Sequence, residues 1–169
     1  VTGRVLFRYN LGAAIESAPA VDVQRDEVFV AGADGRVHAL HGADASVIWR
    51  GEAPGIVRSQ PLLTRDAVYI VTEDDIVVAL SREDGEALWT YRREPAGEFH
   101  IAGHAGLTIV GRRVLAGFSD GTVAALDLTD GSVLWERATD VDIEVAEGGA
   151  PVFTDVDTTP VVIGETIYI

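Results

Sequence analysis

The sequence predicts an all-β fold, a β-propeller built of four-stranded antiparallel blades. Three tryptophans, Trp49, Trp89 and Trp135, lie 40 and 46 residues apart, and an Ala-Leu pair precedes each of them at the same distance. A repeat of this length that holds four short strands is typical of a propeller blade. No stretch shows a sustained 3.6-residue hydrophobic period, so we expect almost no helix.

Each repeat consists of short apolar, β-branched runs that are separated by tight turns. The turn between the second and third runs is Asp-Gly at 34–35 and at 120–121, whereas the middle repeat has Asp74-Asp75 there. Glycine readily adopts the positive φ that a two-residue hairpin needs. The runs are apolar throughout rather than alternating, which is expected when neighbouring blades bury both faces of each strand.

The tryptophans are predicted to pack between blades. Repetition at a fixed register indicates architecture rather than chemistry, because each repeat contacts only its neighbours. An indole offers a large flat surface that fits between two sheets. A turn glycine precedes two of the tryptophans by four residues, so the predicted structural repeat residues are Trp49, Trp89, Trp135, Gly85 and Gly131.

The repeats divide the chain, which we treat as a single partial propeller over residues 1–169. The predicted parts are the last strand of one blade (1–10), three blades (11–50, 51–94 and 105–137), and the start of a further blade (159–169). Two enlarged connections separate them, at residues 95–104 and 138–158.

The repeat resembles that of a known superfamily. The pattern Ala-Leu-Asp-x-x-x-Gly-x-x-x-Trp, complete from Ala125 to Trp135, resembles the tryptophan-docking repeat of the quinoprotein (PQQ-type) propellers. The resemblance covers nearly the whole chain, and it implies a ring of seven or eight blades. The sequence accounts for about four blades, so we expect a fragment of such a ring, completed by further sequence or by a second copy. Enzymes, sensors and scaffolds share this repeat, so it does not specify the function.

The enlarged connections are the candidate functional segments, because insertions in repeat proteins commonly carry binding sites. Both follow the fourth strand of a blade, so we expect them on one rim. Phe99 and Ile101 place apolar side chains on a Gly-flanked segment, which indicates a protein contact. The alternative is that both side chains fold back over the neighbouring blade.

The end of the second enlarged connection carries a more specific resemblance. Asp-Val-Asp-Thr-Thr-Pro-Val-Val, from Asp155 to Val162, resembles the BamB family, the propeller lipoproteins of the outer-membrane β-barrel assembly machine. In that family the earlier loop contacts BamA through its periplasmic POTRA domains. The resemblance therefore implies that Phe99, His100 and Ile101 contact this partner at the periplasmic face of the outer membrane. No Arg follows the apolar pair here, which departs from the family pattern.

The residues just before the further blade also have a structural interpretation. Short polar side chains cap loop backbone ahead of a strand, and such a corner is rigid enough to shape a binding rim. We call this set the rim corner, and its members are Asp155, Asp157, Thr158, Thr159 and Pro160.

Composition limits the expected partners. The chain has 13 Lys and Arg against 27 Asp and Glu, a formal net charge of −14. Such a surface repels nucleic acid and anionic lipid, so neither is an expected partner. No apolar run approaches the roughly 20 residues of a membrane span, so a membrane attachment requires an anchor outside this chain. Cysteine is absent, which removes disulfides and thiol chemistry from these residues.

No catalytic, cofactor-binding or metal site is predicted. Residues 140–151 resemble the start of a calcium loop, but Val145 stands where that loop requires glycine and Pro151 where it requires glutamate. His100 and His104 are spaced as on one helix face, but two nearby glycines disfavour a helix there.

The predicted function is a non-catalytic scaffold of outer-membrane protein assembly, with unfolded outer-membrane protein strands as a second partner at exposed strand edges. One alternative is a part of a PQQ-dependent dehydrogenase, although the chain lacks the adjacent Cys pair of the cofactor platform in that family. The other alternative is an extracytoplasmic ligand-binding or sensor domain.

Overall fold

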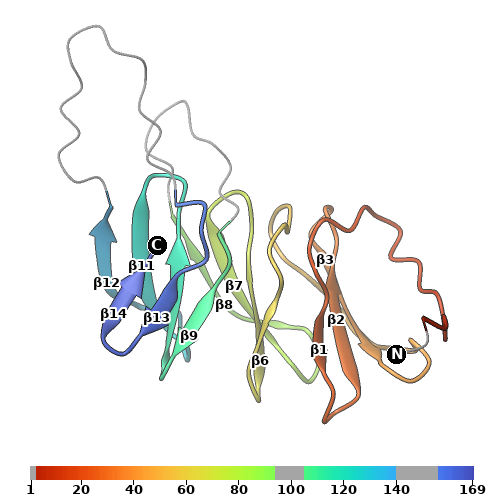
Figure 1. Cartoon of the computed structure of the whole chain (residues 1–169). Coiled ribbons are helices and arrows are strands. Elements are labelled where there is room, and N and C mark those ends of the chain that lie inside the picture. The colour runs from red at the N-terminus through yellow and green to blue at the C-terminus, as the bar shows by residue number, and fades with distance from the viewer. Residues whose placement is uncertain (1–2, 94–104, 140–155) are drawn as a thin grey trace, which may run out of the picture.

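The computed structural model describes residues 3–93, 105–139 and 156–169. These residues form fourteen strands and no helix. Three four-stranded antiparallel sheets and a two-stranded one follow one another along the chain (Figure 1). This arrangement confirms the predicted all-β fold with four-stranded blades. Among the described residues there is accordingly no helix that could span a membrane.

Consecutive strands pair within each sheet, so every complete blade is a simple meander. The first blade contains β1 (Ala20–Asp22), β2 (Glu27–Ala31), β3 (Arg36–His41) and β4 (Val47–Glu52). The second contains β5 (Leu62–Leu63), β6 (Ala67–Val71), β7 (Ile76–Ser81) and β8 (Ala87–Arg92). The third contains β9 (Thr108–Val110), β10 (Arg113–Gly117), β11 (Thr122–Asp127) and β12 (Val133–Ala138). The fourth blade begins with β13 (Val161–Ile163) and β14 (Thr166–Tyr168).

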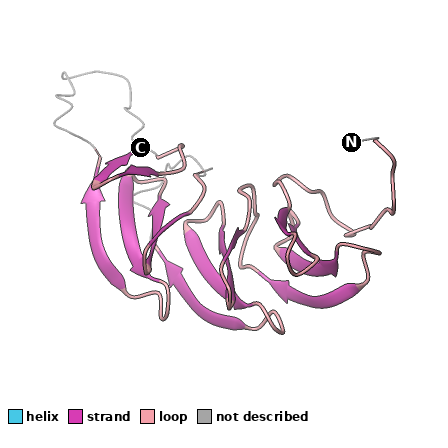
Figure 2. Cartoon of the chain, turned by 60° about the horizontal axis from the view of Figure 1, so that its bottom comes forward, coloured by secondary structure: helices cyan, strands magenta, loops and turns pink. Residues whose placement is uncertain are grey.

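The blades stand side by side and fan out as an open arc (Figure 2). Their internal register is the same, because the Ala of each Ala-Leu pair lies opposite the Trp of the next strand and a β-bulge follows. The three opposed pairs are Ala39 with Trp49, Ala79 with Trp89, and Ala125 with Trp135. The small alanine side chain leaves room beside the indole on a crowded sheet.

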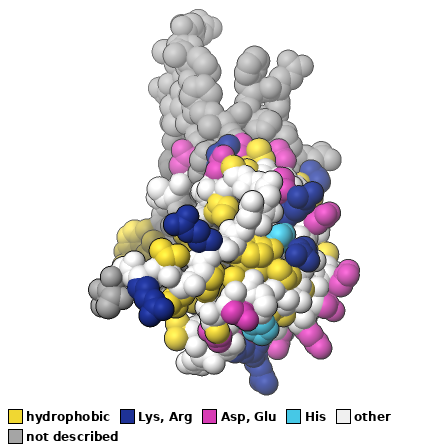
Figure 3. Space-filling model, turned by 90° about the vertical axis from the view of Figure 1, so that its right-hand side faces the viewer, with side chains coloured by type: hydrophobic (Ala, Val, Ile, Leu, Met, Phe, Trp, Pro, Cys, Tyr) yellow, Lys and Arg dark blue, Asp and Glu magenta, His cyan; other side chains and the backbone are white. Residues whose placement is uncertain are grey.

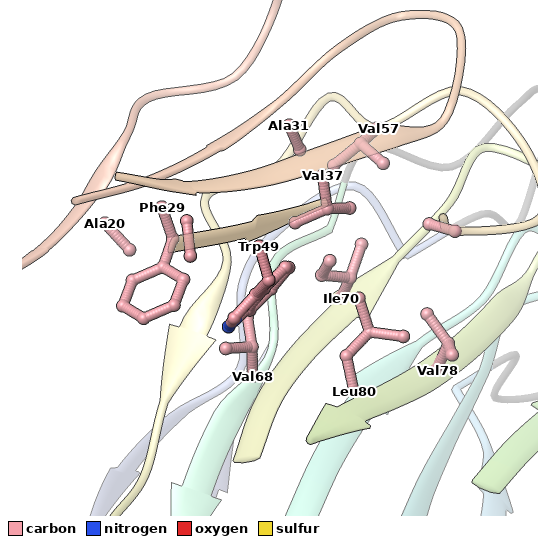
Figure 4. Packing of buried hydrophobic residues seen from close by; sticks show 12 residues of the cluster. Ala20, Phe29, Ala31, Val37, Trp49, Val57, Val68, Ile70, Val78 and Leu80 are labelled. Atoms are coloured by element: carbon pink, nitrogen blue, oxygen red, sulfur yellow. The ribbon is translucent and has the colours of Figure 1, made fainter. Parts of the chain in front are cut away.

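The hydrophobic core lies between blades rather than within one. Between the first two blades, Trp49 points toward Val68 and Leu80 of the second blade (Figure 4). A similar cluster, which includes Trp89, joins the second blade to the third. The second blade is therefore covered on both faces, and every residue of β6 is buried. Burial on both faces explains why the strands are apolar throughout.

Both enlarged connections begin from strand ends on one rim of the arc, and we call this rim the loop rim. It holds the turns at residues 32–35, 72–75 and 118–121, and β4, β8 and β12 all end at it (top of Figure 1). Segments 94–104 and 140–155 each begin two residues after the end of a strand, β8 and β12 respectively, and both lie outside the described residues.

The start of the chain differs from the prediction. A blade strand is expected within residues 1–10, but residues 3–19 contain no strand. A strand requires a hydrogen-bonding neighbour, and none of the described strands pairs with this segment. Leu11 is nevertheless buried, and the Tyr9 hydroxyl lies 2.8 Å from His38 Nδ1 of the first blade. Figure 3, which views this end of the arc, shows hydrophobic side chains gathered across its middle.

Candidate partner-docking rim

Trp49 and Trp89 link neighbouring blades in the same way. The Trp49 indole N–H donates a hydrogen bond to the Arg82 carbonyl at 2.8 Å, and the Trp89 indole N–H donates one to the Leu128 carbonyl at 3.1 Å. Both carbonyls belong to the turn between the third and fourth strands of the next blade. A buried indole N–H requires such an acceptor.

Each of these two indoles packs against a glycine of the same turn. A Cβ added to Gly85 would lie 2.5 Å from the Trp49 ring, and a Cβ added to Gly131 would lie 2.5 Å from the Trp89 ring. Trp135 is half-buried and instead lines a pocket with Val162 and Ile167 of the fourth blade. The indoles of Trp49 and Trp89 thus position successive blades through turns on the rim opposite the loop rim.

Arg93 joins the second and third blades at the loop rim. It follows β8 directly and precedes segment 94–104. Its guanidinium contacts Asp120 at 2.6 Å, Thr122 at 2.9 Å and Glu136 at 3.1 Å, and it lies 5.7 Å from the centre of the Phe118 ring. Burial is the largest single effect and opposes the charge of Arg93. The interactions with Asp120, Tyr91 and Glu136 together outweigh it, so the pKa of Arg93 is raised.

Asp75 makes a second connection at the same place. It occupies the turn position that is glycine in the other two blades, Gly35 and Gly121, and its φ is 56°. Asp75 is only 2% exposed, and its carboxylate accepts hydrogen bonds from the Ser119 N–H, at 3.0 Å, and from the Ser119 hydroxyl. Its carbonyl accepts the Arg93 N–H at 3.1 Å. We call the following set the rim network: Asp75, Arg93, Ser119, Asp120 and Glu136.

The described part of the rim corner joins the third blade to the fourth. The Gly106 N–H donates a hydrogen bond to the Thr159 hydroxyl at 2.9 Å. The Thr108 hydroxyl donates one to the Pro160 carbonyl. Residues 105–108 follow segment 94–104, and Thr159 and Pro160 lie shortly after segment 140–155, so these bonds connect described residues that follow the two enlarged segments.

The other rim-corner residues are placed only in part. The side chains of Asp157 and Thr158 are exposed, and Asp155 lies outside the described residues. Their capping role therefore stays a prediction.

The predicted contact residues Phe99, His100 and Ile101 also lie outside the described residues, as does the calcium-like stretch from 140 onward. Within the parts that the structure describes, no group of three or more His, Asp or Glu side chains is arranged to hold a metal ion.

A second arginine, Arg82, links blades on the opposite rim, and it is buried. The Arg82 side chain, 5% exposed, pairs with Asp22 at 2.5 Å and with Glu27 at 2.6 Å, both from the first blade. Its guanidinium lies 5.3 Å from the centre of the Phe29 ring. The hydrogen bond from Arg82 is the main cause that lowers the pKa of Asp22.

Sequence reasoning does not single out either arginine. In the other complete repeats the position of Arg93 is held by Ala53 and Thr139, so no recurring pattern marks it. The sequence does contain a signal for Asp75, because this residue stands where the other two repeats have the glycine of an Asp-Gly turn.

Comparison with known proteins identifies the family. The family described as "Outer membrane protein assembly factor BamB" matches residues 1–169. The chain belongs to the BamB family. The BamB protein of Shewanella oneidensis is 31% identical over 163 residues, and the match covers 94% of this chain and 39% of that relative.

Solved structures show the same fold. BamB from Moraxella catarrhalis superposes with a TM-score of 0.81 at 23% identity, over 96% of this chain and 48% of that one. Quinohemoprotein alcohol dehydrogenase from Comamonas testosteroni superposes with a TM-score of 0.63 at 18% identity, over 74% of this chain and 21% of that one. The chain thus spans less than half of the length of these BamB relatives.

Proposed function

We propose that this chain is part of a non-catalytic scaffold in outer-membrane protein assembly, at the periplasmic face of the outer membrane. The observation that carries the proposal is the match of residues 1–169 to the BamB family. A curated relative that is 31% identical bears the name of an outer membrane protein assembly factor. In this proposal the chain forms no bond with a substrate and acts by holding partners in place.

The proposed mechanism is docking of the loop rim onto the POTRA domains of BamA. Phe99, His100 and Ile101 are the proposed contacts, from the segment that begins after Arg93. Support comes from the described residues at this rim. Polar contacts of Arg93 with Asp120 and of Asp75 with Ser119 connect the second and third blades next to the point where segment 94–104 begins. A rigid mount lowers the entropy lost on association, so a small set of contacts then suffices for binding.

A second proposed contact uses the outer strands. Among the described strands, β4, β8 and β12 each have a neighbour on one side only, so an extended peptide can pair with the free side. Leu88 of β8 and Leu134 of β12 are 55% and 47% exposed and provide apolar contacts beside this edge. The proposed ligands are the strands of unfolded outer-membrane proteins.

The test is calorimetric binding of the full-length protein to the POTRA segment of BamA from the same organism. We expect micromolar or tighter binding, and we expect Phe99→Ala/Ile101→Ala to abolish it without lowering the melting temperature. Leu88→Ala/Leu134→Ala is the matched control, since it removes exposed apolar side chains from the outer strands instead.

Three outcomes would count against the proposal. Absence of binding by the folded wild-type protein would lead to a titration with PQQ, which tests the dehydrogenase alternative. A large fall in melting temperature for the Phe99/Ile101 variant would show that these side chains pack against a blade. Loss of binding in the control variant alone would move the docking site to the outer strands.

A further inference from the structure

We infer that β8 is the outer strand to which an extended polypeptide adds, by pairing with its free edge. This assignment rests on the proposed function and deepens its second contact, because it selects one of the three outer strands. The partner that fits this edge is an uncharged stretch of unfolded polypeptide. Every residue of β8 belongs to the described part of the chain.

The register of β8 shows which of its backbone groups face the free edge. In an antiparallel pair, residues that exchange hydrogen bonds alternate with residues whose N–H and C=O groups point away from the partner strand. The Arg93 N–H donates a hydrogen bond to the Asp75 carbonyl at 3.1 Å. Arg92, opposite Ile76, is therefore of the second kind, and so is Thr90, two residues earlier. The N–H and C=O groups of Thr90 and Arg92 thus point away from β7, toward a side on which no described strand lies.

The other two outer strands have edges of the same geometry. The residue after each strand donates the equivalent hydrogen bond, to the carbonyl of the turn glycine. With the same register, this bond places two residues of each strand at the free edge. These residues are Arg50 and Glu52 in β4, and Glu136 and Ala138 in β12.

Side-chain charge distinguishes the three edges. The first of the two edge residues is Arg50 in β4 and Glu136 in β12, but it is the uncharged Thr90 in β8. A charge within an edge strand commonly protects it from pairing with other chains, since an added strand would remove water from the charge. Residues 87–91 contain no charged side chain. Among the described outer strands, β8 is therefore the one whose edge lacks this protection.

The side chains along β8 also offer apolar surface to a partner. Ala87, Leu88 and Thr90 are exposed, and Leu88 is 55% exposed. The residues of β4 at the positions of Ala87 and Leu88 are Val47 and Ile48, and both are partly buried. A strand added to β8 would thus cover apolar surface as well as pair with the backbone.

The third blade holds β8 in place through the residues that alternate with Thr90 and Arg92. The Trp89 indole N–H donates to the Leu128 carbonyl at 3.1 Å, and the Tyr91 hydroxyl donates to the Glu136 carboxylate at 2.9 Å. A strand that is already fixed loses little conformational entropy when a peptide pairs with it.

The test measures binding of a defined peptide to the full-length protein. The probe is a synthetic peptide of alternating valine and threonine with a lysine at each end. The same peptide with N-methylated valines is its control, because it has the same charge but lacks backbone donors that pairing requires. We expect only the unmethylated peptide to bind. Equal binding of both peptides would show charge attraction alone and would overturn the inference.

Substitutions at equivalent edge positions identify the strand. Thr90→Pro removes an N–H that points away from β7, so β8 keeps its bonds to β7 while the peptide loses a partner. Thr90→Arg gives β8 the charge that β4 carries at this register, and it serves if the proline variant does not fold. Each variant should weaken peptide binding by about tenfold. Arg50→Pro makes the matched change in β4 and should alter binding by less than about twofold.

Amide exchange measured by NMR gives a second readout at single residues. The amides of Thr90 and Arg92 should exchange rapidly in the free protein and more slowly with the peptide bound. The amides of Trp89 and Tyr91, which bond to β7, should not change. Slower exchange at the edge of β4 or β12 instead would overturn the inference.

These outcomes are distinguishable from failure of the proposed function. If both Thr90 variants bind the peptide as tightly as the wild-type protein, the inference alone is overturned, and the second contact moves to another outer strand. If the wild-type protein does not bind the peptide, the inference and the second contact both fail. Docking to BamA is measured without the peptide, so its result is independent of this test.

Discussion

At the scale of single residues, two glycines decide how closely the blades approach each other. Gly85 and Gly131 have φ values of 79° and 72°, and each lies against an indole of the preceding blade. Any side chain at these positions meets the ring and also occupies the left-handed region. The glycine of the repeat is therefore required for two separate reasons.

We expect Gly131→Ala to destabilise the protein by about 2–4 kcal/mol, because backbone strain adds to the collision with Trp89. Gly111→Ala is the matched control, since Gly111 has a φ of 61° and nothing within 4 Å of an added Cβ. The control should lose only about 1–2 kcal/mol from backbone strain. Urea unfolding of both variants measures the difference, and equal losses would mean that the ring contact contributes nothing.

At the scale of elements, ion pairs at both rims connect neighbouring blades. Arg82, from the β7–β8 turn, pairs with Asp22 and Glu27 of the first blade. Arg93, at the end of β8, pairs with Asp120 of the third blade. The second blade thus supplies both arginines, one at each rim, and each neighbour supplies carboxylates.

Acid should weaken the contact between the first and second blades. The hydrogen bond from Arg82 holds the pKa of Asp22 below its ordinary value. A carboxyl group with a depressed pKa in the folded state stabilises the protein above its unfolded pKa, and this contribution disappears as the pH falls through the folded pKa. We therefore expect the free energy of unfolding to decrease below about pH 4, and to decrease less in Arg82→Gln. Urea unfolding between pH 6 and about pH 2.5 tests this.

Other carboxyl groups contribute to the same acid response. Hydrogen bonds from serine side chains lower the pKa of Asp44, Asp84 and Asp130. These groups are unchanged in Arg82→Gln, so the difference between the two pH profiles belongs to the Arg82 ion pairs. Parallel profiles would contradict the assignment.

At the scale of the whole molecule, burial is greatest in the middle of the arc and least at its ends. Every residue of β6 is buried, whereas Val161, Ile163 and Tyr168 of the fourth blade are exposed. In a repeat protein each unit is stabilised mainly by its neighbours. We therefore expect the free energy of local unfolding to be higher in a blade that neighbours cover on both faces than in a blade that is covered on one face.

Hydrogen exchange of the 169-residue chain should reflect this gradient. We expect the slowest amide exchange in β6 and β7, and exchange close to that of an unprotected chain in β13 and β14, whose outer faces are exposed. Equal protection in the two regions would show that another surface covers the fourth blade. Repeating the measurement at several protein concentrations would then tell whether that surface belongs to a second copy.

The sequence predicts the fold far better than the candidate site. The repeat around Trp49, Trp89 and Trp135 predicts both the order of the strands and the positions of the turns, because each copy packs against neighbouring blades in a similar way. A strand is predicted within residues 1–10, but the described residues 3–10 contain none, since strand formation depends on a neighbour and not on propensity alone. The contact role of Phe99 stays a prediction.

The amino-acid sequence by itself determined the all-β class, the blade repeat and the family, because hydrophobic pattern and turn chemistry act over a few residues and recur along the chain. Only the tertiary structure decided which carboxylate meets which arginine. Arg93 and Asp120 are 27 residues apart, and Arg82 and Asp22 are 60 apart. Their pairing depends on how the turns of neighbouring blades align. The sequence position of a charged residue does not indicate which residue it pairs with in the folded chain.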